Sequence, residues 1–150
     1  MLKFFSIVVL LIVLLDQSTK YLTQSLMYEG QSIPIIKNFF HLTYVLNPGA
    51  AFGMLAHKTL FFILVTMLVI VIAIYFYRRI PKAKWLLRLG LSLQVGGAIG
   101  NLIDRIRIGM VVDFFDFRIW PVFNIADMAI VIGVGILFVE ILRYGEKEVA

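Results

Sequence analysis

The chain is short and strongly apolar. It has 150 residues, of which 61% are hydrophobic and 15% are charged, with a net charge of +5 and no cysteine. Soluble domains average about 45–50% apolar and about 25% charged residues, so this chain cannot cover itself with polar surface and needs a bilayer as part of its solvent. The lack of cysteine excludes disulfides, thiol catalysis and cysteine-based zinc sites. At this length we expect one domain, residues 1–150.

Four apolar stretches are each close to the roughly 20 residues that cross a hydrocarbon core about 30 Å thick. They cover residues 4–25, 60–77, 86–104 and 122–142. Helices must do the spanning, because a helix closes its own backbone hydrogen bonds. The predicted fold class is therefore all-α integral membrane, a bundle of four transmembrane helices with a small β-rich extracytoplasmic segment.

The first stretch could instead be a cleaved signal peptide, because Lys3 precedes the apolar run Ile7–Leu15 as an n-region precedes an h-region. The residues from Asp16 to Lys20 contain no A-x-A cleavage site, so we interpret the stretch as a retained helix. Asp16 and Lys20 are four residues apart with the acid first, which favours an ion pair on one helix face. We expect this pair to have a structural or positioning role.

Positive charge in the short loops predicts the orientation. The connector 78–84 carries Arg78, Arg79, Lys82 and Lys84, which places it in the cytoplasm together with both termini. The segments 26–58 and 104–121 then lie outside. A basic chain could also bind nucleic acid, but here the positive residues lie near the ends of apolar runs, where topology explains them. We expect no nucleic-acid partner.

The outer segment 26–58 is the expected β-rich part. Residues 41–46 are typical of a strand, and Asn47, Pro48 and Gly49 form a turn signal. We expect a small β structure that rests on the outer face of the membrane.

Polar and ionisable residues inside spans are costly, and each is by default a hypothesis about function. With the predicted orientation, polar groups from several segments fall near one depth, at the outer interface. These groups are Asp16, Asn101, Asp104, Asp113, Asn124 and Asp127. Such a convergence predicts a site at this interface.

The residue types at this site favour carboxylate chemistry. The chain has no H-E-x-x-H motif, and its two histidines, His41 and His57, are far from the cluster in sequence, so we expect no metal. It has no G-x-S-x-G elbow for a serine nucleophile. Two close aspartates can share one proton, so that the ionised one activates water and the protonated one binds the scissile carbonyl, without a cofactor.

Five motifs then appear in order along the chain. They are Asp16-Gln-Ser-Thr-Lys20, Asn47-Pro-Gly-Ala-Ala-Phe-Gly53, Gly96-Gly-Ala-Ile-Gly-Asn-Leu-Ile-Asp-Arg105, Val111-Val-Asp-Phe114 and Phe123-Asn-Ile-Ala-Asp127. Together they resemble the motif set of the bacterial lipoprotein signal peptidases, over nearly the whole chain. That family cleaves the signal peptide from prolipoproteins just before a cysteine that already carries diacylglycerol.

The resemblance implies roles for individual residues. Asp113 and Asp127 match the catalytic aspartates of the family. The residues that by resemblance would line the substrate site are Asn47, Asn101, Arg105 and Asn124. Apart from the resemblance, we expect structural or positioning roles for Asp16, Lys20, Gly53 and Asp104. The resemblance also implies diacylglyceryl-prolipoprotein substrates and membrane lipids as partners, in the bacterial cytoplasmic membrane, with the active site near the extracytoplasmic face. We expect a monomer without a cofactor.

Three expectations concern the surroundings of the aspartates. An extended segment 111–117 would place Asp113 on the buried side and Asp116 toward water. Asp127 is expected within its apolar run rather than at a helix cap. Asp104 is expected to close the third helix as a structural carboxylate paired with the adjacent Arg105.

The glycine motif and two alternative functions also have to be considered. Gly96-x-x-x-Gly100 is expected to permit close helix packing rather than chemistry. A small proton-coupled transporter subunit could also place aspartates between helices, but it would need polar groups through the full depth of the membrane. A non-catalytic scaffold would explain the glycines but not the position of Asp127.

Overall fold

The computed structural model describes residues 2–49 and 58–149, so Gly53 and His57 lie outside the described residues. The elements follow one another as helix α1 (Leu2–Leu26), strands β1 (Ser32–Ile36) and β2 (Phe40–Asn47), helices α2 (Thr59–Arg79) and α3 (Trp85–Ile108), strand β3 (Val111–Asp116) and helix α4 (Ile125–Val149). All four helices are long and apolar enough to cross a membrane. The prediction of a four-helix membrane bundle with a small β structure is confirmed.

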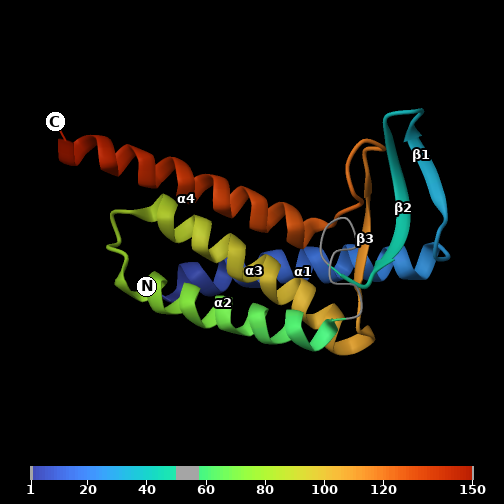
Figure 1. Ribbon diagram of the computed structural model, residues 1–150, viewed down its shortest axis with the longest axis horizontal. Coiled ribbons are helices and arrows are strands. Elements are labelled where there is room, and N and C mark those ends of the chain that lie inside the picture. Colours follow the sequence, from blue (N-terminus) through green and yellow to red (C-terminus); the bar gives the residue numbers. More distant parts are fainter. Residues whose placement is uncertain (1, 50–57, 150) are drawn as a thin grey trace.

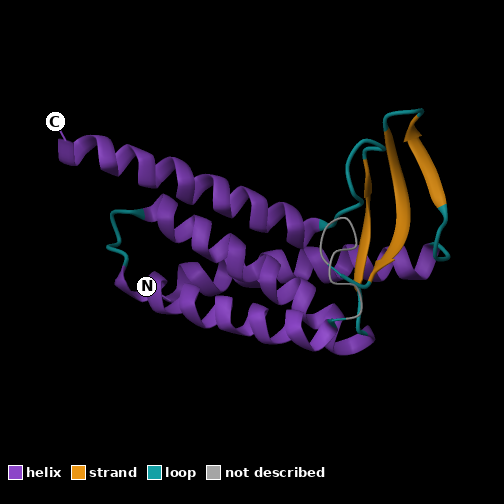
Figure 2. Ribbon diagram, viewed as in Figure 1, coloured by secondary structure: helices purple, strands orange, loops and turns teal. Residues whose placement is uncertain are grey.

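The sheet stands at one end of the bundle, as Figures 1 and 2 show. The connector between α2 and α3 and the ends of α1 and α4 that lead to the two termini are at the opposite end (Figure 1). The polar residues predicted to converge therefore have to meet at the end that carries the sheet.

Helix α3 is the centre of the bundle, because it packs against α1, α2 and α4. Its glycines allow the other helices to approach closely. A Cβ on Gly96 would lie 2.9 Å from Ile12 Cβ of α1, and one on Gly90 would lie 3.0 Å from the carbonyl oxygen of Gly133 in α4. The expectation that this glycine-rich stretch serves helix packing is confirmed.

The sheet is antiparallel with the strand order β1-β2-β3. Ser32 pairs with Thr43 between β1 and β2, and Val45 pairs with Asp113 between β2 and β3. The expected β structure in 26–58 thus gains a third strand from the second outer connector. Phe123 forms a further bridge with Phe115 and covers the free edge of β3.

Two helices differ in extent from the expected spans. Helix α3 continues past residue 104 to Ile108 and ends where Gly109 adopts a left-handed backbone with φ 77°, a conformation that glycine adopts without strain. Helix α4 begins at Ile125 rather than at residue 122, because Phe123 still bridges to β3 and Asn124 caps the helix.

The packing predicts different effects on stability for two glycine-to-alanine changes. A Cβ on Gly97 would clash with the carbonyl oxygen of Ala126 and lie 2.8 Å from Ile130 Cγ1, whereas a Cβ on Gly135 would meet nothing within 4 Å. Gly97→Ala should therefore lower the free energy of unfolding in detergent by about 1–3 kcal/mol, as overpacking does. Gly135→Ala is the matched control and should leave it unchanged or slightly raised. Equal effects of the two changes would contradict this account of the α3–α4 contact.

Candidate functional site

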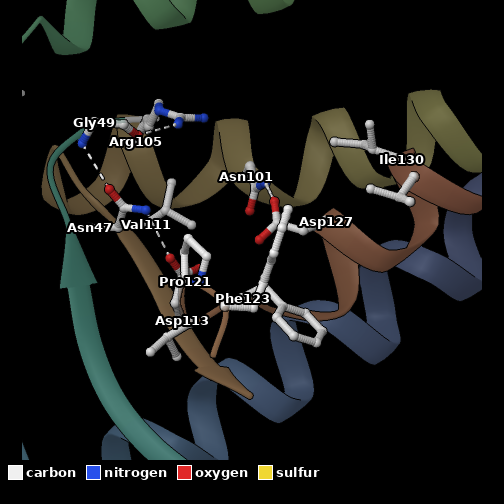
Figure 3. Close-up of a pocket in the computed structure, with 13 residues that line it drawn as sticks. Asn47, Gly49, Asn101, Arg105, Val111, Asp113, Pro121, Phe123, Asp127 and Ile130 are labelled. Carbon is white, nitrogen blue, oxygen red and sulfur yellow. Dashed lines mark hydrogen bonds between the residues drawn. The ribbon is translucent and has the colours of Figure 1, made fainter. Parts of the chain in front are cut away.

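A cavity of about 260 Å³ lies where the sheet meets α3 and α4. Figure 3 shows Asn47 directed toward Asp113 and Asn101 directed toward Asp127, with Arg105 beside Gly49 at the edge of this space. Five of the predicted site residues line it, each from a different part of the chain except for one pair on α3, and they are Asn47, Asn101, Arg105, Asp113 and Asp127. Apolar side chains such as Val111, Phe123, Ile130 and Val131 form the rest of the wall.

Asp113 enters the cavity from β3. Its side chain is buried, with a residue exposure of 2%. Asn47 Nδ2 donates to Asp113 Oδ2 at 3.0 Å, and Asn124 Nδ2 donates to Asp113 Oδ1 at 2.7 Å. Burial raises the pKa of Asp113 to about 7, the negative charge of Asp127 acts in the same direction, and the two amide hydrogen bonds oppose the shift.

Asp127 lies in the first turn of α4 and is part of a capping box with Asn124. The backbone N–H of Asp127 donates to Asn124 Oδ1 at 2.9 Å, and the backbone N–H of Asn124 donates to Asp127 Oδ2 at 3.2 Å. The expectation that Asp127 sits away from a cap was wrong, because the helix starts later than the apolar run does. Capping occupies only one carboxylate oxygen, since Oδ1 accepts a 2.7 Å hydrogen bond from Asn101 Nδ2.

Asn124 therefore joins the two aspartates. Its side-chain amide holds Asp113 at 2.7 Å, while its backbone N–H holds Asp127 at 3.2 Å. The residue is fully buried, with an exposure of 0%, and its amide also donates to the carbonyl oxygen of Val112. One asparagine thus fixes two carboxylates that belong to different elements and face one cavity.

A buried ion cluster lies next to this site. Lys20 Nζ is 2.9 Å from Asp16 Oδ2 and 2.8 Å from Asp104 Oδ2, so the predicted pairing of Asp16 with Lys20 is confirmed. The expected partner of Asp104 was Arg105, and this was wrong: adjacent residues on a helix point in different directions, and Asp104 faces α1 instead.

The two carboxylates of the cluster also hold backbone groups of the elements that carry the cavity aspartates. Asp16 Oδ1 accepts a hydrogen bond from the N–H of Ala126 at 2.9 Å, and Asp104 Oδ2 accepts one from the N–H of Val112 at 3.1 Å. The start of α4 and strand β3 are therefore both anchored to the ion cluster. The predicted structural roles of Asp16 and Asp104 did not include these backbone partners, which lie far away in the chain.

Arg105 is held in place at the rim of the cavity. Its Nη2 donates to the carbonyl oxygen of Gly49 at 3.2 Å, and its guanidinium carbon lies 4.8 Å from the centre of the Phe62 ring. Both contacts leave a cationic donor among the cavity-lining groups. Phe62 was missed by the sequence reasoning, since a phenylalanine in an apolar span carries no signal of its own.

Asp116 is buried, with an exposure of 5%, and not turned to water as expected. It does lie on the face of β3 opposite Asp113, but Thr43 Oγ1 and the backbone N–H of Arg118 donate to it at 2.7 and 2.8 Å. Desolvation by itself would raise the pKa of Asp116, and these hydrogen bonds together with the charge of Arg118 outweigh it and lower the pKa. The predicted alternation of faces was correct, but the predicted exposure was wrong, because Thr43 of the neighbouring strand and Arg118 contact the carboxylate.

Within residues 2–49 and 58–149, no three acidic or histidine side chains gather as a metal site would require. The polar groups of the cavity are instead two carboxylates, three amides and one guanidinium, once Asn124 is counted with the lining residues. Two carboxyl groups that face one cavity can act on the same bound substrate, one as a proton donor and the other as a proton acceptor.

The family model described as signal peptidase (SPase) II matches residues 8–143. Curated relatives include a lipoprotein signal peptidase of Moorella thermoacetica, which is 56% identical over 138 residues that cover 92% of each chain. Another is a lipoprotein signal peptidase of Clostridioides difficile, 45% identical over 144 residues that cover 95% of this chain and 97% of the relative.

Solved structures resemble the chain as well. A bacterial membrane enzyme determined by the in meso method at 2.3 Å resolution gives a TM-score of 0.87 at 35% identity and covers 94% of this chain and 88% of its own. A second bacterial membrane enzyme, determined by the same method at 1.9 Å resolution, gives a TM-score of 0.83 at 36% identity with 93% of each chain covered.

The raised pKa of Asp113 predicts a pH-dependent stability. The folded protein keeps this proton up to about pH 7, whereas the unfolded chain releases it near the ordinary value of 3.8. Because the folded state binds more protons between these limits, this group's contribution is complete at low pH and is lost as pH rises through about 7, on the order of 4 kcal/mol in all. Asp113→Asn should remove this decline in the free energy of unfolding, measured in detergent across that range. Identical slopes for the two proteins would contradict the assignment.

Proposed function

Because the chain belongs to the signal peptidase II family of membrane proteases, we propose that it is an intramembrane aspartyl endopeptidase that uses Asp113 and Asp127. We further propose that its substrates are diacylglyceryl-modified prolipoproteins and that it cleaves just before the lipidated cysteine. The main support for this mechanism is that Asn124 donates hydrogen bonds to both carboxylates, which line the same cavity.

The environments of the two aspartates suggest their roles. Asp113 is the more buried, and its pKa of about 7, raised by burial and by the charge of Asp127, favours the protonated form at neutral pH. Asp127 accepts a backbone N–H at the N-terminus of α4 and the amide of Asn101, both of which favour a carboxylate. In this proposal Asp113 is the acid and Asp127 the base.

The reaction then proceeds in two proton-balanced steps. Asp127 removes a proton from water, the resulting hydroxide attacks the scissile carbonyl carbon, and Asp113 gives its proton to the carbonyl oxygen. In the second step the protonated Asp127 gives its proton to the leaving nitrogen, the C–N bond breaks, and Asp113 recovers a proton from the tetrahedral hydroxyl. The pair ends with one shared proton, as it began.

The cavity wall suits a peptide that arrives from a bilayer. Val111, Ile130 and Val131 offer apolar contact, while Asn47 and Arg105 supply donors for the peptide backbone. The α4 face beside the cavity is apolar, with Val131 69% exposed. We propose that the lipid tails of the substrate remain in the bilayer while the scissile peptide bond enters between the two aspartates.

The proposed orientation places the cavity near the extracytoplasmic face and both termini in the cytoplasm. The basic connector 78–84 and the cavity are at opposite ends of the bundle (Figure 1), and basic loops favour the cytoplasmic side. We propose a monomer in a bacterial cytoplasmic membrane, since one chain by itself supplies both carboxylates of the proposed pair and the amides that hold them.

Asparagine substitutions test the aspartyl mechanism. Asp113→Asn and Asp127→Asn should each lower kcat on a micellar diacylated lipobox peptide by several orders of magnitude, because each removes one of the two proton-transfer groups and keeps its shape. Asp16→Asn and Asp104→Asn should act mainly on thermal stability or KM. Turnover that survives Asp113→Asn in a folded protein and is lost in Asp104→Asn would show that the pair is assigned wrongly. Activity lost to a chelator and restored by zinc would argue for a metal instead.

Labelling with a membrane-impermeant maleimide tests the orientation. The chain has no native cysteine, so each engineered cysteine reports alone. Lys37, between β1 and β2, and Lys82, between α2 and α3, are both exposed. These two connections lie at opposite ends of the molecule (Figure 1). In intact spheroplasts Lys37→Cys should react and Lys82→Cys should be protected until the membrane is permeabilised. The reverse pattern would invert the orientation and move the cavity to the cytoplasmic side.

A further inference from the structure

Lys20 is a buried cation that no step of the proposed reaction uses. Its exposure is 1%, although it lies on α1, whose residues line none of the cavity described above. An ammonium has three N–H donors, and here all three have partners, namely Asp16 at 2.9 Å, Asp104 at 2.8 Å and the side-chain oxygen of Asn101 at 2.9 Å. Because all three N–H groups of the ammonium have partners, its position is fixed.

The third contact determines how the amide of Asn101 is turned. Asn101 Oδ1 accepts from Lys20 at 2.9 Å and from Asn124 Nδ2 at 3.1 Å. If the amide were flipped, its NH₂ group would face two donors, one of them charged. With the oxygen held by Lys20, the NH₂ group must point the other way, and it donates to Asp127 Oδ1 at 2.7 Å.

The two aspartates consequently differ in the donors they receive. Asp113 accepts from two neutral amides, those of Asn47 and Asn124. Asp127 accepts from an amide whose oxygen is bound to an ammonium, and hydrogen bonds in such a chain polarise and strengthen one another. The difference favours negative charge at Asp127.

We propose that Lys20 is a positioning residue that assigns the roles of the two aspartates, by turning the Asn101 amide toward Asp127 and holding the negative charge of the pair there. The inference rests on the proposed aspartyl mechanism and adds to it the residue that decides which carboxylate is the base. Lys20 touches neither aspartate of the pair in the contacts above and reaches Asp127 through Asn101. Burial and the charge of Asp127 raise the pKa of Asp113, and they outweigh the charge of Lys20, which lowers it.

Other charges around the pair have to be kept constant in any test. From α1 they are Asp16 and Lys20 itself, and from α3 they are Asp104 and Arg105. At the same end of α2 the described charged group is Lys58, which is exposed. On β3, Asp116 lies on the opposite face and pairs with Arg118. Strand β2 contributes the neutral amide of Asn47.

A purely structural role would require only the two ion pairs. Removing Lys20 alone would leave two buried carboxylates without a cation and would destabilise the fold, so that variant by itself cannot separate the two roles. The separation comes from Lys20→Gln in an Asp104→Asn background. The double variant keeps the net charge of the native cluster, because one negative and one positive charge are removed together.

The experiment is the pH profile of kcat on the diacylated lipobox peptide, for the native protein and for Asp104→Asn with Lys20→Gln, which have the same net charge in the cluster. Asp104→Asn alone is the control for loss of that carboxylate. Without the ammonium, the limb on the acid side, where the pair takes up its second proton, should move to higher pH by roughly one unit or more. The plateau should fall as well, because Asn101 is free to turn. Ser92→Ala removes a fully buried hydroxyl that bonds only the carbonyl oxygen of Arg88 in the described structure, and it should leave the profile unchanged.

If the acid limbs of the native protein and the double variant coincide, and only the plateau or the amount of folded protein is lower, the positioning role of Lys20 is overturned and a structural one is left. If the double variant folds but does not turn over, infrared titration of the carboxyl band that Asp113→Asn abolishes gives the same comparison, and an unchanged midpoint would again overturn it. If it does not fold, Lys20→Gln in an Asp16→Asn background replaces it with the same expected shift. Failure of the aspartyl mechanism is distinguishable, since turnover would then survive Asp113→Asn and Asp127→Asn.

Discussion

The burial of one ammonium group holds the functional end of this protein together. Lys20 brings a carboxylate of α1 and a carboxylate of α3 to within 2.9 Å of one nitrogen, and each carboxylate then binds a backbone N–H of a further element, α4 through Ala126 and β3 through Val112. Taking three charges out of water costs several kcal/mol for each ion unless all their hydrogen-bonding groups are satisfied. Here the hydrogen bonds that these buried ions require fix four elements relative to one another. Two of these elements, β3 and α4, carry the proposed catalytic aspartates.

That cluster can form only because the helices approach closely. A Cβ on Gly100 would lie 2.5 Å from Asp16 Oδ2, so any larger residue would push the carboxylate away from the start of α4. Gly96 and Gly97 similarly allow α1 and α4, respectively, to lie close against α3. In a bilayer, association of helices depends on such close packing and on interhelical hydrogen bonds, because lipid tails are as apolar as leucine. The glycines and the ion cluster therefore act as one unit.

The two aspartates acquire different chemistry from the same few neighbours. Asn124 is the cap of α4, the bridge between the carboxylates and a partner of Asn101. The capping contacts at the start of α4 orient Asp127 toward the cavity. Strand β3 brings Asp113 to the wall of the same cavity. Burial raises the pKa of Asp113 to about 7, and the charge of Asp127 adds to this shift. A carboxyl group that is protonated near neutral pH beside an ionised one is what the proposed mechanism needs.

The sequence by itself determined the membrane class, the four helices and the ion pair of Asp16 with Lys20, because apolar run length and i, i+4 spacing are local properties of the chain. It also identified the polar residues that meet at one end, since the cost of polar groups in a bilayer makes each of them stand out. Only the tertiary structure decided that Asp104 pairs with Lys20 and not with Arg105, and that Asp116 is buried. These outcomes depend on which elements lie side by side, and contacts between α1 and α3 or between β2 and β3 join residues far apart in the chain, where no local pattern reports them.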